Sequence, residues 1–174
     1  QNDDHLLVIH DGFKGMASLP TPADYGWTNV IYSTHLFEWT AKSKADYDTA
    51  ISLFYKTSWE KAQARQNVPY FVGSFSTIWD EDWAYESVDA LTTFFNTHSW
   101  SWSLWTLKRL DCPIESKLWD TRSQWGLLGS LATTFERPDV FADDQATLKR
   151  KLASYATLPV NPNEELLRRL KAAL

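Results

Sequence analysis

The chain has 174 residues, 44% of them hydrophobic, which excludes an intrinsically disordered polypeptide and suffices for the core of one ordinary domain. Its net charge of −5 and its dispersed basic residues argue against nucleic-acid binding, which depends on clustered Lys and Arg. No apolar run approaches the roughly 20 residues that cross a bilayer, and a lone cysteine, Cys112, excludes an internal disulfide and a cysteine-based metal cluster.

Four short apolar runs predict buried strands. In chain order they are Leu6 to His10, Asn29 to Thr34, Tyr70 to Gly73 and Ser101 to Leu107. Apolar residues at helical spacing predict helices over 45–66 and 84–98, between the second, third and fourth runs. The connection over 13–27 holds two glycines and two prolines, which indicates a loop. Strands joined by helical crossovers form parallel βαβ units.

An irregular segment follows the fourth run, and two further helices are predicted after it, over 143–155 and 163–174. Asp143 or Asp144 is the expected N-cap of the first. The second carries acidic residues in its first turn and basic residues later, which matches the helix dipole. Its predicted buried stripe is Leu166, Leu167, Leu170 and Leu174, and its predicted solvated face is Arg168, Arg169 and Lys171.

Parallel strands with polar residues at their C-terminal ends predict either a (β/α)8 barrel or a doubly wound sheet. The doubly wound alternative lacks a phosphate loop, because neither a G-x-G-x-x-G nor a Walker A pattern follows any run. A complete barrel needs eight strands and roughly 250 residues. The expectation is therefore half a barrel, which leaves two strand edges and a large apolar face uncovered.

The ends of the four runs carry polar and aromatic residues, and barrel enzymes place their catalytic groups at these ends. The residues there are Asp11, then His35 with Phe37 and Glu38, then Ser74, then Trp102, Trp105 and Lys108. Each also has a structural interpretation: His35 as a core or loop histidine, Asp11 as a loop cap, Trp105 as core filler. Ser74 is not the nucleophile of a hydrolase elbow, because no Gly-x-Ser-x-Gly pattern surrounds it.

Ten tryptophans are more than a core of this size needs. Aromatic faces stack on the apolar faces of sugar rings, so a carbohydrate groove would account for some of them. Core packing remains the favoured interpretation for most of the ten.

The stretch from Val68 to Phe75 closely resembles the seventh-strand motif of family 5 glycoside hydrolases, usually Pro-x-x-x-Gly-Glu-Phe or Pro-x-x-x-Gly-Glu-Trp. In that family the glutamate is the catalytic nucleophile, and this position holds Ser74 here. The aromatic, acidic stretch that follows contains Trp79, Asp80 and Glu81. The chain therefore resembles a sugar-cleaving scaffold that lacks its central carboxylate.

Three other motifs are similar to the same family in the same order. The stretch over 8–13 resembles the fifth strand of the exo-glucanase-like and diglycosidase-like branches, and that over 32–37 the sixth-strand His-x-Tyr motif. The histidine of that motif carries over to His35, whereas its tyrosine is Phe37 here. The stretch over 102–108 resembles the eighth strand, in which Trp105 would be the platform under the sugar. The resemblance covers about residues 5 to 130.

The resemblance implies one domain over 1–174, which is the C-terminal half (strands 5 to 8) of a (β/α)8 TIM barrel plus C-terminal helices. It implies a secreted, retaining hydrolase of β-glucosides, β-glucans or diglycosides that uses no metal or organic cofactor. The expected partner is an N-terminal half-barrel chain with the acid/base glutamate, because the Asn-Glu-Pro motif has no counterpart here. The implied catalytic positions are Ser74 and His35, and the implied substrate-binding residues are Trp105, Trp102, Asp11, Phe37, Trp79 and Lys108.

Two hypotheses of different class explain the serine. Retaining glycosidases need two carboxylates about 5 Å apart, and Glu38, Asp80 and Glu81 are interpreted as subsite or solvated residues rather than substitutes. Under the first hypothesis, Ser74 is an engineered replacement of the nucleophile in half of an enzyme. Under the second, the serine is natural and the chain is a non-catalytic sugar-binding module descended from such an enzyme.

Overall fold

The centre of the protein is a four-stranded parallel sheet with strand order β1-β2-β3-β4, so the chain is an α/β protein. In the computed structural model the described residues are 5–12, 14–38, 40–52, 57–77, 82–109, 126–130, 136–157 and 160–174. The strands are β1 (Leu7–His10), β2 (Val30–Phe37), β3 (Tyr70–Ser76) and β4 (Ser101–Leu104). All four predicted strands are confirmed. β2 and β3 run further than predicted and β4 ends earlier, so His35 and Ser74 lie within strands rather than after them.

The connections between strands mostly follow the sequence prediction. Two short 3-10 turns, η1 (Met16–Ser18) and η2 (Pro22–Tyr25), replace a crossover helix between β1 and β2, as the glycines and prolines indicated. Between β3 and β4 lies α3 (Asp82–Thr97), which confirms the predicted helix.

The helix predicted over 45–66 is confirmed at both of its ends, and residues 53–56 in between lie outside the described residues. The structure has two helices there, α1 (Lys44–Ala50) and α2 (Thr57–Gln66). The side chain of Ser43 accepts a hydrogen bond from the Asp46 N–H and caps α1. The backbone adopts a wider π-type turn at residues 51–52, directly after α1.

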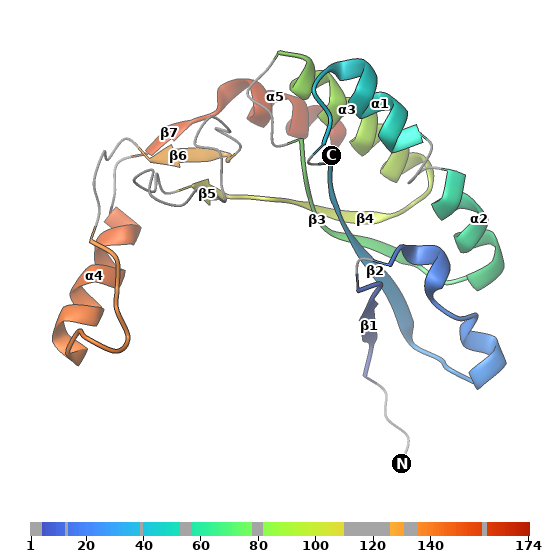
Figure 1. Ribbon diagram of the computed structural model, residues 1–174, viewed down its shortest axis with the longest axis horizontal. Coiled ribbons are helices and arrows are strands. Elements are labelled where there is room, and N and C mark those ends of the chain that lie inside the picture. The colour runs from blue at the N-terminus through green and yellow to red at the C-terminus, as the bar shows by residue number, and fades with distance from the viewer. Residues whose placement is uncertain are drawn as a thin grey trace.

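The helices cover one face of the sheet. Figure 1 shows α1, α2 and α3 along the same side of the four strands. On this side the Phe75 and Phe95 rings meet edge to face at 5.2 Å, and the Tyr70 and Trp100 rings lie 5.0 Å apart. Trp59 is 2% exposed against the same cluster. The main apolar core therefore lies between the sheet and its helices, as expected for βαβ units.

A second, smaller sheet follows β4 and was not predicted. It consists of β5 (Lys108–Arg109), β6 (Leu128–Ser130) and β7 (Val160–Pro162). β5 and β6 are parallel, and β6 and β7 are antiparallel. In Figure 1 this sheet lies between the end of β4 and the last two helices, so it joins them to the main body.

The last helix, α5 (Glu164–Ala173), is confirmed and packs on α3. Leu166 and Leu170 are buried there, but Leu174 is 95% exposed because the helix ends one residue earlier, so the predicted stripe is too long. The prediction of a solvated basic face is wrong for Arg169. Its guanidinium pairs with Asp89 on α3 and with Glu165, and lies over the Tyr85 ring.

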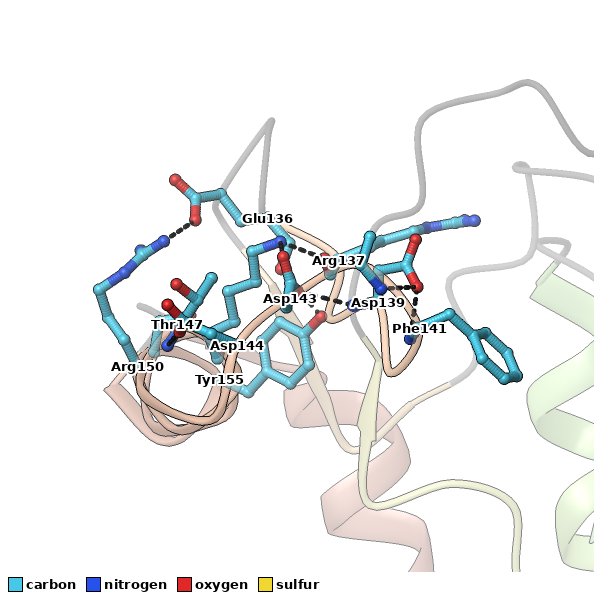
Figure 2. A network of polar contacts seen from close by, with 12 residues as sticks. Glu136, Arg137, Asp139, Phe141, Asp143, Asp144, Thr147, Arg150 and Tyr155 are labelled. Atoms are coloured by element: carbon cyan, nitrogen blue, oxygen red, sulfur yellow. Dashed lines mark hydrogen bonds and ion pairs between the residues drawn. The ribbon is translucent and has the colours of Figure 1, made fainter.

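The helix α4 (Gln145–Thr157) has no buried residue and lies apart from the main sheet (Figure 1). Polar contacts hold it to the turn that precedes it, as Figure 2 shows. Lys151 donates hydrogen bonds to both oxygens of Asp143, while the Asp144 carboxylate accepts from the Thr147 N–H and caps the helix. Of the two expected N-caps, Asp144 is therefore the cap and Asp143 the ion-pair partner.

Candidate functional site

The sheet surface turned away from the helices carries a cluster of imidazole and hydroxyl groups. The His10 and His35 rings lie 4.4 Å apart, edge to face. A Cβ atom added at Gly73 would lie 3.0 Å from Ser33 Oγ and 3.2 Å from His35 Nε2. The Ser103 hydroxyl donates a hydrogen bond to the Gly73 carbonyl. We call this surface the open face and define it by His10, Ser33, His35, Gly73 and Ser103.

Ser74 lies on the open face because of a β-bulge at Gly73. The strand register pairs Thr34 with Val72 and then His35 with Ser74, so Gly73 is the additional residue. Directly opposed residues of neighbouring strands share a face, so Ser74 points to the same side as His35. Ser74 is 9% exposed. The bulge also explains the glycine, because any larger side chain would press on Ser33 and His35.

The structure brings Asp11 to this cluster through His10, a residue that the sequence interpretation missed. The Gly12 N–H donates a hydrogen bond of 2.9 Å to His10 Nδ1, and Asp11 Oδ1 lies 3.5 Å from the same nitrogen. Asp11 itself is buried, and its other oxygen accepts a 2.8 Å hydrogen bond from the Thr34 hydroxyl. Alternation along β1 could have identified His10, because it lies two residues from Val8 at the end of a strand.

The environment of His35 lowers the pKa of its imidazole below the ordinary value of 6.5. Burial is the main cause, since it disfavours the charged ring, and the neighbouring His10 acts in the same direction. Asp11 opposes both with its negative charge. The site therefore favours a neutral imidazole at this position.

A lowered histidine pKa makes the folded protein less stable in acid. Between the native pKa and about 6.5 the unfolded chain binds the proton and the folded one does not, so the free energy of unfolding decreases as the pH is lowered. This contribution is fully present above about 6.5 and is lost as the pH drops to the native pKa. We expect His35→Gln to flatten this part of the profile in urea unfolding between pH 7.5 and 4.5. Identical slopes in the two proteins would contradict the prediction.

Of the three tryptophans predicted at the site, the structure describes Trp102 and Trp105, and these two differ in their surroundings. Trp105 directly follows β4 and its residue is 58% exposed, and its backbone N–H donates a hydrogen bond to the Phe75 carbonyl. Trp102 instead faces the helices, where its ring meets Phe75 at 5.8 Å and its Nε1–H donates to Asn96 on α3. Period-2 alternation allows Trp102 and Ser103 only opposite faces. Trp105 is thus the tryptophan accessible to a ligand, and Trp102 contributes to packing.

The remaining candidates are partly placed. Phe37 ends β2, half-buried and opposite Ser76, on the same face as His35. Lys108 lies in β5, paired with Leu128. Trp79, Asp80 and Glu81 lie outside the described residues.

Glu38 is occupied locally. Its buried carboxylate accepts hydrogen bonds from both the N–H and the hydroxyl of Thr40, so it stabilises the turn after β2. Its carboxylate is therefore not solvated, whereas a solvated residue was one of the two interpretations of Glu38 from the sequence.

An open depression lies at the other end of the sheet. Its volume is about 690 Å³, and Val68, Pro69, Glu60 and His98 are among its lining residues. Pro69 immediately precedes β3, so this depression is at the N-terminal edge of the sheet, whereas Ser74 lies near the C-terminal end of the same strand. Parallel sheets bind ligands at the C-terminal edge, so the open face is the better candidate site.

The chemistry available on the open face is hydrogen bonding by imidazole and hydroxyl groups, and an exposed indole, that of Trp105, directly follows β4. Within the described part of the chain, no group of three or more His, Cys, Asp or Glu side chains is arranged to hold a metal ion. None of the described helices has the length and apolarity needed to cross a bilayer. Comparison of the chain with protein-family models, with curated proteins and with solved structures finds no match.

Proposed function

We propose that this chain is the C-terminal half, strands 5 to 8, of the (β/α)8 barrel of a secreted, retaining β-glycosidase similar to family 5 glycoside hydrolases, with serine at the nucleophile position. One observation carries the proposal. Ser74 and His35 oppose each other on adjacent parallel strands and share the open face. If the family resemblance holds, these are the positions of the nucleophile on the seventh strand and of the histidine on the adjacent sixth strand.

The topology of the sheet supports the barrel interpretation. Four parallel strands in sequential order, with helices on one side, form the repeating unit of a (β/α)8 barrel. The edge strand β1 leaves Leu7 and Val8 more than half exposed, which is costly for two apolar residues on opposite faces. Four further strands, from a separate chain or from another part of the polypeptide, would cover this edge and close the barrel.

The proposed substrate is a β-glucoside, a β-glucan or a diglycoside. A neutral sugar offers hydroxyl groups to His35 and Ser74, and the exposed face of Trp105 offers a stacking platform. Retaining hydrolysis needs a carboxylate nucleophile that forms a glycosyl ester, together with an acid/base carboxyl. The acid/base glutamate would come from the N-terminal half. The Ser74 hydroxyl cannot replace the nucleophile, so this form should bind substrate with negligible turnover, without metal or organic cofactor.

A non-catalytic sugar-binding module is the alternative. It is favoured by two coincident replacements, because both the nucleophile and the tyrosine that would hydrogen-bond it are lost, at Ser74 and Phe37. The two hypotheses differ in one measurable property. A module should bind a glucoside by itself, whereas half of an enzyme should bind only beside its complement.

Substitution of Trp105 tests the proposal directly. We expect Trp105→Ala to weaken binding of a β-linked glucose disaccharide about 10-fold, because the sugar loses an apolar contact of roughly 1.4 kcal/mol. The matched control is Trp27→Ala, since Trp27 is 43% exposed but lies in the connection before β2. Calorimetric titration, with and without an N-terminal half barrel from a family 5 enzyme, measures both effects. Equal affinities for both variants would contradict a platform at Trp105.

A further inference from the structure

The open face contains two histidines in contact, and only one of them is explained by the resemblance. His35 matches the sixth-strand motif, whereas His10 comes from β1 and meets it edge to face with ring centroids 4.4 Å apart. Two imidazoles at this distance cannot both be charged without mutual repulsion. The protonation of one ring therefore depends on the other.

The surroundings of His10 fix its tautomer. Because the Gly12 N–H donates to His10 Nδ1, this nitrogen must be an acceptor, and the neutral ring carries its proton on Nε2. Asp11 Oδ1 lies 3.5 Å from the same Nδ1 and is positioned to accept a hydrogen bond when that nitrogen is protonated. Asp11 is held by its hydrogen bond from Thr34, so the carboxylate is a fixed element of the arrangement.

We propose that His10 is a positioning residue that holds the His35 imidazole oriented toward position 74, and that protonation of His10 switches this arrangement. In the neutral state Nδ1 accepts from Gly12. In the protonated state Nδ1 carries a hydrogen, so it cannot accept from the Gly12 N–H and instead donates to Asp11. The His10 ring must therefore rotate relative to the His35 ring. The expected effect on sugar binding rests on the proposed function. The coupling between His10, Asp11 and His35, which we call the relay, does not.

The groups that face the pair are few within the described residues. β1 contributes His10 and, just beyond its end, Asp11, whose carboxylate accepts from Thr34; β2 contributes Ser33 beside His35, and β3 contributes Gly73 and Ser74. Of the side chains near His35 named here, only those of His10 and Asp11 are ionisable. Both act on His35, since His10 lowers the pKa of the His35 ring and Asp11 raises it.

NMR titration of the histidine rings tests the relay, and the four histidines of the chain keep the spectrum simple. We expect His10→Asn to raise the pKa of His35 and Asp11→Asn to lower it, because the two neighbours act with opposite sign. The asparagine oxygen at position 10 still accepts from the Gly12 N–H, and that at position 11 still accepts from Thr34. The matched control is His98→Gln, which removes a histidine paired with Glu60 and should leave the His35 titration unchanged.

The unsubstituted protein provides a test that does not depend on how the variants fold. Ring ¹⁵N shifts at neutral pH should show a protonated Nε2 and an unprotonated Nδ1 for His10. The opposite tautomer would overturn the proposal. Shifts of the same sign in His10→Asn and Asp11→Asn, or no shift in His10→Asn, would overturn it as well.

Ligand binding tests the consequence for the site. We expect the affinity for a β-linked glucose disaccharide to fall several-fold between pH 7.5 and 5, and this dependence to disappear in His10→Asn. The same pH dependence in both proteins would overturn the switch. If the NMR shifts follow the prediction but no glucoside binds at any pH, with or without an N-terminal half barrel, the relay stands and the proposed function fails.

Discussion

Replacement of Ser74 by glutamate is expected to produce a hydrolase, provided that the barrel is completed by an N-terminal half with its acid/base glutamate. The new carboxylate would project from the position opposite His35 onto the open face, where a nucleophile must reach the anomeric carbon. Loss of a covalent nucleophile costs up to about 10⁶-fold in kcat in other enzymes, so the gain should span several orders of magnitude. Release of nitrophenol from a nitrophenyl β-glucoside measures it.

The control for this gain is Ser103→Glu, which adds the same charge to the same face one strand away. Ser103 is exposed on β4 and hydrogen-bonded to the Gly73 carbonyl, so its neighbourhood is similar but its register is not that of the nucleophile. We expect no turnover from this variant. An inactive Ser74→Glu protein in a folded, complete barrel, or equal activity of both variants, would contradict the enzyme hypothesis and favour the binding module.

Truncation of Phe75 is expected to have the largest effect on stability. Its ring is fully buried between the Phe95 and Trp102 rings on the helix side of β3. Removal of a buried phenylalanine leaves a cavity that the surroundings fill only in part, at a cost of about 3–5 kcal/mol. This is a large fraction of the roughly 5–15 kcal/mol by which a domain is stable. Urea unfolding of Phe75→Ala should therefore show a much lower midpoint.

The matched control is Phe71→Ala on the same strand. Phe71 is only half-buried, and alternation before the bulge places it on the open face, opposite to Tyr70 and Val72. We expect its truncation to cost less than about 1.5 kcal/mol in this chain, because the half-buried ring removes little apolar surface from water. Equal destabilisation by the two variants would mean that the open face is packed as tightly as the helix face.

The strand prediction succeeded because buried parallel strands have a strong local signature. Each strand is a short run of apolar or aromatic residues between turn signals, and no distant contact is needed to recognise it. Helix boundaries were less secure. The apolar spacing over 45–66 suits one regular helix, but the backbone adopts a turn of different pitch at residues 51–52, directly after α1. A pattern of spacing does not register such a local change in hydrogen bonding.

The candidate site was predicted in part. Position 74, His35 and Trp105 were named from local motifs, and the register and alternation of the sheet put the first two on one face. Trp102 was misassigned because a motif says nothing of the face on which a residue lies. His10 was missed because its relevance comes from contact with a residue 25 positions away, on another strand.

The α/β class, the four strands with their order along the chain, and the presence of polar groups at the strand ends follow from the amino-acid sequence alone. These properties depend on short-range periodicity and on the composition of single segments. The bulge at Gly73, the contact between His10 and His35, and the different surroundings of Trp102 and Trp105 become visible only in the folded structure. Each of these depends on strand register, and a shift of one residue between neighbouring strands moves every side chain to the other face.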